Sequence, residues 1–203
     1  MSSSRSLLPL VAVVAAATAM TVGCSSDRDA QIDDETASGQ PSVTTEETDD
    51  GLVAEQIDTN SDGEPDIIRY YEEYQDPRDE DRTRRRIRKM EIDVTNDGTI
   101  NVRRDYDEFG NVTREENDQN LDGVIDTILE FTGEELSRKI LKDDDGQTMI
   151  EQRIYYDGQL VRVEQDTSGD GTVDHWEYYE DEVLMRIGRD TNSDGSADTW
   201  QMR

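Results

Sequence analysis

The sequence predicts a mostly β fold, an antiparallel meander of repeated β-hairpins joined by Asp-rich loops. Three observations support this prediction. The motif D-x-[NS]-x-D-G-x-x-D recurs along the chain. Segments rich in β-branched and aromatic residues follow its copies, and such residues favour strands. Hydrophobic residues make up only 32% of the 203 residues, too little for a thick core, so the chain needs a thin, repetitive arrangement.

The N-terminal residues predict export and lipid anchoring. Residues 7–20 form an apolar run behind Arg5, and this run is shorter than the roughly 20 residues of a membrane-spanning helix. We therefore predict a signal peptide over residues 1–23. The segment 21–24 (TVGC) resembles the lipobox of bacterial lipoproteins, which implies lipidation of Cys24. Ser25 and Ser26 then imply an outer-membrane address, facing either the periplasm or the cell exterior. A plain secretory signal with an incidental thiol is the alternative.

The rest of the chain divides by composition into a tether and a repeat domain. Residues 24–51 are mostly Ser, Thr, Asp and Glu, and we expect a flexible, disordered acidic tether that carries the lipid anchor. Residues 52–203 form the repeat domain. Its motif glycines fall at 63, 98, 123, 146, 171 and 195. These positions indicate about six units with a period of about 24 residues and one insertion in the first unit.

The recurring motif carries the oxygen ligands that hard cations prefer. Side chains at positions 1, 3, 5 and 9 of a tight loop can converge on one Ca²⁺ ion, which takes about six to eight oxygens, and glycine at position 6 permits the sharp turn. A metal-free Asp/Asn/Gly turn is the alternative. The candidate ligands of the four strong copies are Asp58, Asn60, Asp62, Asp66, Asp118, Asn120, Asp122, Asp126, Asp166, Ser168, Asp170, Asp174, Asp190, Asn192, Asp194 and Asp198. A weaker copy adds Asp93, Asp97 and Asn101.

One loop matches a longer pattern than the others. Residues 166–177 (DTSGDGTVDHWE) fit the twelve-residue EF-hand loop, with Glu177 at position 12 as a bidentate ligand. The other strong copies have Arg69, Leu129 and Gln201 at that position. We therefore expect the loop that begins at Asp166 to be the best single site.

The segments around the loops predict strands and fix where the loops lie. Segments such as 126–131 (DTILEF) lead away from a loop, a short turn follows, and segments such as 135–142 (ELSRKILK) lead back. In an antiparallel meander of this kind, all acidic loops lie at one end of the sheet and all short turns at the other. Successive loops are then two strands apart, about 9.5 Å, which is about one Debye length. We therefore expect the fold to depend on Ca²⁺.

The combined pattern resembles secreted bacterial proteins with tandem D-x-N-x-D-G-x-x-D-x-W-x-x-Y-Y repeats. The acidic half is similar to the loops of EF-hands, dockerins and thrombospondin type 3 repeats, and the segment 155–162 (YYDGQLVR) is similar to YD-type hairpin repeats. This resemblance implies calcium-binding loops and a surface location. The leucine-rich helices of dockerins are missing, so cohesin binding is not implied.

Charge narrows the candidate partners. The formal net charge of -29 counts against nucleic acid, which needs the opposite sign. The basic segment 82–90 is expected to pair with the acidic segment 70–81 across a lengthened hairpin. With one histidine and one cysteine, we expect no enzyme. The expected function is a membrane-anchored, calcium-binding repeat lipoprotein with a structural role or a protein or glycan partner. A metal-free structural or protein-binding hairpin array is the alternative.

Overall fold

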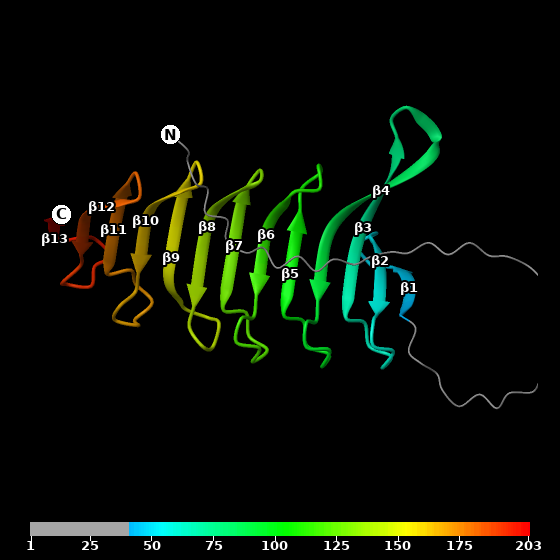
Figure 1. The fold of residues 1–203 in the computed structure, drawn as a ribbon, viewed down its shortest axis with the longest axis horizontal. Coiled ribbons are helices and arrows are strands. Elements are labelled where there is room, and N and C mark those ends of the chain that lie inside the picture. Colours follow the sequence, from blue (N-terminus) through cyan, green and yellow to red (C-terminus); the bar gives the residue numbers. More distant parts are fainter. Residues whose placement is uncertain (1–40) are drawn as a thin grey trace, which may run out of the picture. The chain divides into compact units, whose positions relative to one another are not determined.

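The computed structural model of this protein describes residues 41–203, and they form a single antiparallel sheet (Figure 1). The sheet has 13 strands whose spatial order follows the sequence from β1 to β13. The strands are β1 (Ser42–Glu47), β2 (Val53–Asp58), β3 (Ile67–Asp76), β4 (Asp79–Ile92), β5 (Val102–Tyr106), β6 (Val112–Asn117), β7 (Thr127–Thr132), β8 (Glu135–Lys142), β9 (Met149–Tyr156), β10 (Gln159–Gln165), β11 (His175–Glu180), β12 (Val183–Arg189) and β13 (Thr199–Met202). The predicted antiparallel meander is confirmed, and the sheet stays open.

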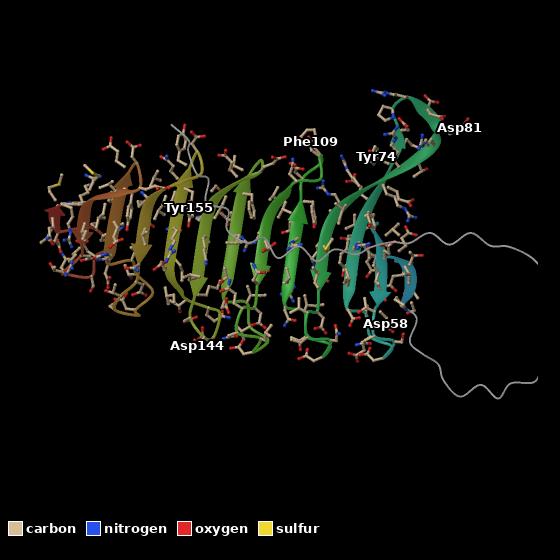
Figure 2. All side chains as sticks on the ribbon, in the orientation of Figure 1. Asp58, Tyr74, Asp81, Phe109, Asp144 and Tyr155 are labelled. Carbon is tan, nitrogen blue, oxygen red and sulfur yellow. The ribbon has the colours of Figure 1, made fainter. Side chains whose placement is uncertain are left out.

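The acidic loops and the short turns lie at opposite ends of the sheet, as the meander geometry predicts. In Figure 1 the loops that join β2 to β3, β4 to β5 and so on lie along the lower edge, and the tight turns lie along the upper edge. Asp58 and Asp144 mark the lower edge in Figure 2, and Phe109 marks an upper turn. Within residues 41–203 no helix is long and apolar enough to cross a membrane.

The sheet begins earlier than the composition predicts. We expected a flexible tether up to residue 51, but β1 (Ser42–Glu47) pairs with β2 along its whole length. The turn between these strands is closed by the amide of Gly51, which donates to the carbonyl of Thr48 over 2.9 Å. Every residue of β1 is exposed. An edge strand therefore forms here through backbone pairing without any apolar burial, which is why composition missed it. The predicted signal peptide, Cys24 and the first part of the tether lie outside the described residues.

The hairpins share one register feature that places an aromatic side chain opposite an aliphatic one. In each of the five hairpins from β3–β4 to β11–β12, the pairing shifts by one residue next to this pair. Such bulges bend a strand and increase its twist. The pairs are Tyr71–Ile87, Tyr106–Val112, Phe131–Leu136, Tyr155–Leu160 and Tyr179–Leu184. Aromatic and aliphatic cross-strand pairs of this kind stabilise a sheet by about 0.2–1 kcal/mol each.

Buried apolar residues are few, as the composition requires. Within the described sheet, only Ala54, Ile128, Val163 and Ile187 are buried hydrophobic residues. Each strand contacts only its neighbours in the sequence, and within residues 41–203 no second layer covers either face (Figure 2). Cross-strand ion pairs such as Arg104 to Glu115 and Arg138 to Glu130 accompany the apolar pairs. The stability of the sheet is therefore a sum of contacts between adjacent strands, as in a repeat protein.

The β3–β4 hairpin is longer than the others, as the insertion in the first unit predicts. Arg85 pairs with Glu73 and Arg86 with Glu72 across β3 and β4, at 2.8 and 2.9 Å. The expected pairing between the basic and acidic segments is confirmed. The tip of this hairpin projects beyond the turns of the other hairpins (Figure 1).

Candidate metal-binding loops

The first aspartate of each loop holds the loop backbone in shape. In the loop that begins at Asp58, the amide of Ser61 donates to Oδ1 and the amide of Gly63 donates to Oδ2 over 3.0 Å. The amides of Gly169 and Gly171 donate to Asp166 in the same way, over 2.6 and 2.7 Å. The loops that begin at Asp93, Asp118 and Asp190 also have their motif glycine amide bound to the first aspartate. The invariant spacing therefore has a local structural cause in the absence of any ligand.

Two positions in each of the five loops that begin with an aspartate take left-handed backbone conformations. The motif glycine does so, for example Gly63 with φ 94°, which side chains with a Cβ resist. The fourth residue does so as well, at Ser61, Asn96, Leu121 and Ser193 with φ between 57° and 64°. The sequence motif identifies only the first of these positions. A glycine at the fourth position, Gly169, is the one sequence signal that indicates the second.

The ninth residue closes the loop by accepting hydrogen bonds from the second. The amide and hydroxyl of Thr59 both donate to Oδ2 of Asp66, and Thr191 binds Asp198 in the same way, over 2.8 Å for each bond. In the weaker loop the amide of Val94 donates to Oδ1 of Asn101 over 2.9 Å. Sequence reasoning assigned no role to the second position, although threonine follows the first aspartate in three of the four strong copies.

The third and fifth residues interact with each other. Asn60 donates from Nδ2 to Oδ2 of Asp62 over 2.8 Å, and the Asp62 amide donates back to Oδ1 of Asn60 over 2.8 Å. The other oxygen of Asp62 accepts from the amide of Glu64 over 2.8 Å. The same exchange joins Asn120 to Asp122, at 2.9 and 3.1 Å. These side chains lie at the exposed tip of each loop.

Adjacent loops contact each other directly. The strand that follows the ninth residue of one loop pairs with the strand that leads into the first residue of the next loop. Asp66 is such a ninth residue and Asp93 such a first residue, and the Asp93 amide donates to the carbonyl of Asp66 over 2.8 Å. The side chain of Asn101 reaches Oδ2 of Asp118 at 3.4 Å. Asp66, Asp93 and Asp118 are each only 4% exposed. The end of the sheet that carries the loops therefore holds a row of buried acidic residues. Neighbouring members of this row, such as Asp66 and Asp93, are one strand apart, whereas the centres of successive loops are two strands apart.

Hydrogen bonds favour the ionised form of two of the carboxylates at this end of the sheet, Asp93 and Asp174. Burial raises the pKa of Asp93, but the hydrogen bonds from the Gly98 amide and from Thr95 outweigh burial and hold the pKa below its usual range. Burial likewise raises the pKa of Asp174, and the hydroxyl and amide of Thr167 reverse the shift. The lowered pKa of Asp93 and of Asp174 favours negative charge, and hence cations, at this end of the sheet.

Glu177 does not take part in the loop to which the EF-hand pattern assigns it. It lies on β11, where Nε2 of His175 is 3.3 Å from Oε1 and the hydroxyl of Tyr179 donates to Oε2. Its cross-strand neighbours are Val163 and Ile187. The four other candidate ligands of this loop, Asp166, Ser168, Asp170 and Asp174, do lie together in one tight turn.

The candidate ligands of each loop are carboxylate, amide and hydroxyl oxygens, which are the types of ligand atom that Ca²⁺ prefers. Each carboxylate oxygen has two lone pairs, so an oxygen that accepts one backbone amide keeps a lone pair for a ligand. The carboxylates point at backbone amides, however, and no three acidic, His or Cys side chains of residues 41–203 are grouped as a metal site would need. Metal binding therefore requires side-chain rotation on a loop backbone that is already formed.

Comparisons with known proteins add little to these observations. No protein-family model matches the sequence, and no curated protein matches it. Among solved structures, "Crystal structure of accessory secretory protein 1,2 and 3 in Streptococcus pneumoniae" is similar at 12% identity with a TM-score of 0.27, over 59% of this chain. The present chain spans 19% of that chain. A TM-score this low carries no inference about fold or function.

Proposed function

We propose that this chain is a lipid-anchored structural repeat protein of the bacterial outer membrane, and that its acidic loops bind Ca²⁺. The observation that carries the proposal is the row of loops along one end of the sheet (Figure 1), four of them with Asp and Asn or Ser at the ligand positions of the motif. Asp66 and Asp93, on neighbouring strands, are both buried and joined through the backbone. Like charges this close repel one another, and a divalent cation on each loop would offset the repulsion.

The anchoring part of the proposal depends on the sequence alone. Cys24 and the TVGC motif would place a lipid at the N-terminal end of the chain, and acyl chains would hold the protein on the membrane surface. The sheet would then present its loops, turns and both faces to a protein or glycan partner. Radiolabelled palmitate incorporation into the wild-type chain and into Cys24→Ser tests this part. The proposal requires label in the wild type and none in the variant.

A second candidate function is a hairpin array that binds no metal and serves as a structural or protein-binding element. One observation favours it. The first aspartate of every strong loop already accepts backbone amides, as Asp58 does from Ser61 and Gly63, so the loop needs no ion to hold its shape. In this case the invariant aspartates are explained by turn formation.

Calorimetric titration with CaCl₂ separates the two candidates. We expect saturable heat with dissociation constants of about 10⁻⁴–10⁻³ M, as in extracellular calcium modules. The variant Asp170→Ala with Asp174→Ala should lose about one site. The matched control is Glu134→Ala with Glu135→Ala, which removes the same charge from an exposed turn at the opposite edge. Equal heats for the two variants, or no saturable heat in the wild type, would support the metal-free array.

A further inference from the structure

The β3–β4 hairpin has a part that stands free of the rest of the sheet. β2 pairs with β3 only as far as Tyr71, and β5 pairs with β4 only from Lys89 onward. Beyond these points, the strands pair only with each other, and their register shifts near the tip, where Gln75 pairs with Thr83 and Asp76 with Asp79, so that residues 80–82 have no partner on β3. Figure 2 shows Tyr74 and Asp81 on this projecting segment, away from the row of turns. An isolated two-stranded ribbon is only marginally stable in water.

The outer edge of β4 is available for another strand. All residues from Asp79 to Arg85 are exposed, and their outward backbone groups have no strand partner among residues 41–203. The free edge ends near Arg86, because Oε2 of Glu108 in the β5–β6 turn lies 4.0 Å from its Nη1. Unpaired edges of this kind are templates for pairing with a second chain.

The order of charges along this edge is self-complementary. An acidic run, Asp79-Glu80-Asp81, is followed by Arg82-Thr83 and then by a basic run, Arg84-Arg85-Arg86. A run of one sign would repel a second copy of itself. An acidic run followed by a basic run attracts a second copy when the two strands are antiparallel, because each acidic half then faces a basic half.

One antiparallel register satisfies both halves at once. It places Glu80 opposite Arg85 of a second copy and Asp81 opposite Arg84 of a second copy. The two-fold axis repeats both pairs. Arg82 then faces Thr83, and a shift by one residue in either direction sets Arg82 against an arginine. The outer edge of β3 offers no such match, since residues 72–76 (EEYQD) contain acidic residues and no basic one.

The acidic residues of the tip have no ion-pair partner among the described residues, although Asp79 accepts a hydrogen bond from the amide of Asp81 over 3.2 Å. Among the described residues, Asp79, Glu80 and Asp81 form no ion pair, whereas Arg84 and Arg85 already contact Asp76 and Glu73, at 2.6 and 2.8 Å. A guanidinium group has five N–H donors, so each arginine can bind a second carboxylate from the neighbouring copy.

We propose that the free edge of β4, from Asp79 to Arg85, joins two copies of this chain into a two-fold symmetric dimer by antiparallel strand pairing. Such an isologous contact closes on itself and does not propagate. The pairing extends the projecting ribbon into a four-stranded sheet and gives its outer backbone groups hydrogen-bonding partners. The contact does not involve the acidic loops, which lie at the opposite end of the strands, so dimer formation needs no calcium.

Light scattering on the full-length chain in a nonionic detergent tests the dimer, with the detergent mass subtracted. We expect twice the mass of a single chain, which is 23.1 kDa for the unprocessed sequence, at about 0.1 M salt and the single-chain value at about 1 M, where the Debye length falls from about 10 to about 3 Å. The variant Asp79→Lys, Glu80→Lys, Asp81→Lys should be monomeric at both salt concentrations. It breaks no ion pair within the described chain.

Two further samples make the outcome decisive. The control Glu134→Lys, Glu135→Lys, Glu180→Lys changes the net charge equally at other turns and should still dimerise. The acidic variant Arg84→Glu, Arg85→Glu should be monomeric alone but should form a mixed dimer with the lysine variant, because opposite charges again face each other. Circular dichroism of each variant checks that the sheet is folded. A monomeric wild type at about 0.1 M salt, a lysine variant that still dimerises, or assemblies larger than two would overturn the proposal.

Discussion

Two motif glycines with the same kind of backbone conformation should respond very differently to alanine. Gly146 and Gly171 have φ of 70° and 88°, and an L-residue in this left-handed region costs about 1–2 kcal/mol. A Cβ on Gly171 would meet nothing within 4 Å, whereas a Cβ on Gly146 would lie 2.5 Å from Cγ1 of Val124 and 3.2 Å from the carbonyl oxygen of Ile125. The difference arises because adjacent loops touch at Gly146.

The expected magnitudes follow from these contacts. Gly171→Ala should lower the free energy of unfolding by about 1–2 kcal/mol through backbone strain alone. Gly146→Ala should lose a further 1–3 kcal/mol, roughly, from overpacking against the preceding loop. Adding Val124→Ala to Gly146→Ala should recover most of this second loss, because it removes the nearest of the two contacts. The carbonyl of Ile125 remains, so the recovery should be incomplete.

Urea unfolding followed by circular dichroism provides the measurement, with the stability change taken from the midpoint at constant slope. The four chains of the Gly146 and Val124 double-mutant cycle give the coupling energy between adjacent loops. We expect a coupling of about 1–3 kcal/mol. A coupling near zero, or equal losses for Gly146→Ala and Gly171→Ala, would refute the claim that neighbouring loops pack against each other.

Two further predictions concern the sheet. Ile128 is 4% exposed, so Ile128→Ala should lower the free energy of unfolding by about 2–5 kcal/mol. Ile150 is 39% exposed, so Ile150→Ala should change this free energy by about 0.5 kcal/mol or less. Equal losses for the two variants in urea unfolding would contradict the assignment of the core. Burial and the 2.8 Å hydrogen bond to Glu91 raise the pKa of Tyr70 to about 12 from 10.0. The folded state therefore favours the neutral phenol, so its contribution to stability is complete below pH 10 and is lost as the pH rises from 10 towards 12. Thermal unfolding between pH 8 and 11.5 should show a steeper loss for the wild type than for Tyr70→Phe, and identical slopes would contradict the shift.

The strands were predictable because each unit repeats a strong local pattern. The segment 135–142 was expected as a strand and coincides with β8. Loop spacing and hairpin turns then determine that strands alternate in direction. β1 was missed because its residues are polar and exposed. Its pairing with β2 depends on backbone hydrogen bonds, which composition does not report.

The candidate site was predictable in its members but not in its contacts. The motif identified the first, third, fifth and ninth residues, and the structure brings Asp166, Ser168, Asp170 and Asp174 into one loop. It places Glu177 elsewhere, on β11 beside Tyr179. Position 12 of a helical EF-hand returns to the ion because a helix turns it back. In a strand, the same position extends away along the sheet.

The conformation of the loops could be inferred from local sequence, because the amide of the glycine at position 6 donates to the aspartate at position 1, only five positions away. The alternation of long acidic loops and short turns along the sequence also predicted that all acidic loops lie at the same end of the sheet. Strand pairing brings Asp66 against Asp93 and Gly146 against Val124, and it leaves one edge of β4 free; none of these three features could be inferred from the local motif. The two contacts join residues of neighbouring loops. They depend on strand register and bulges, which a local motif does not specify.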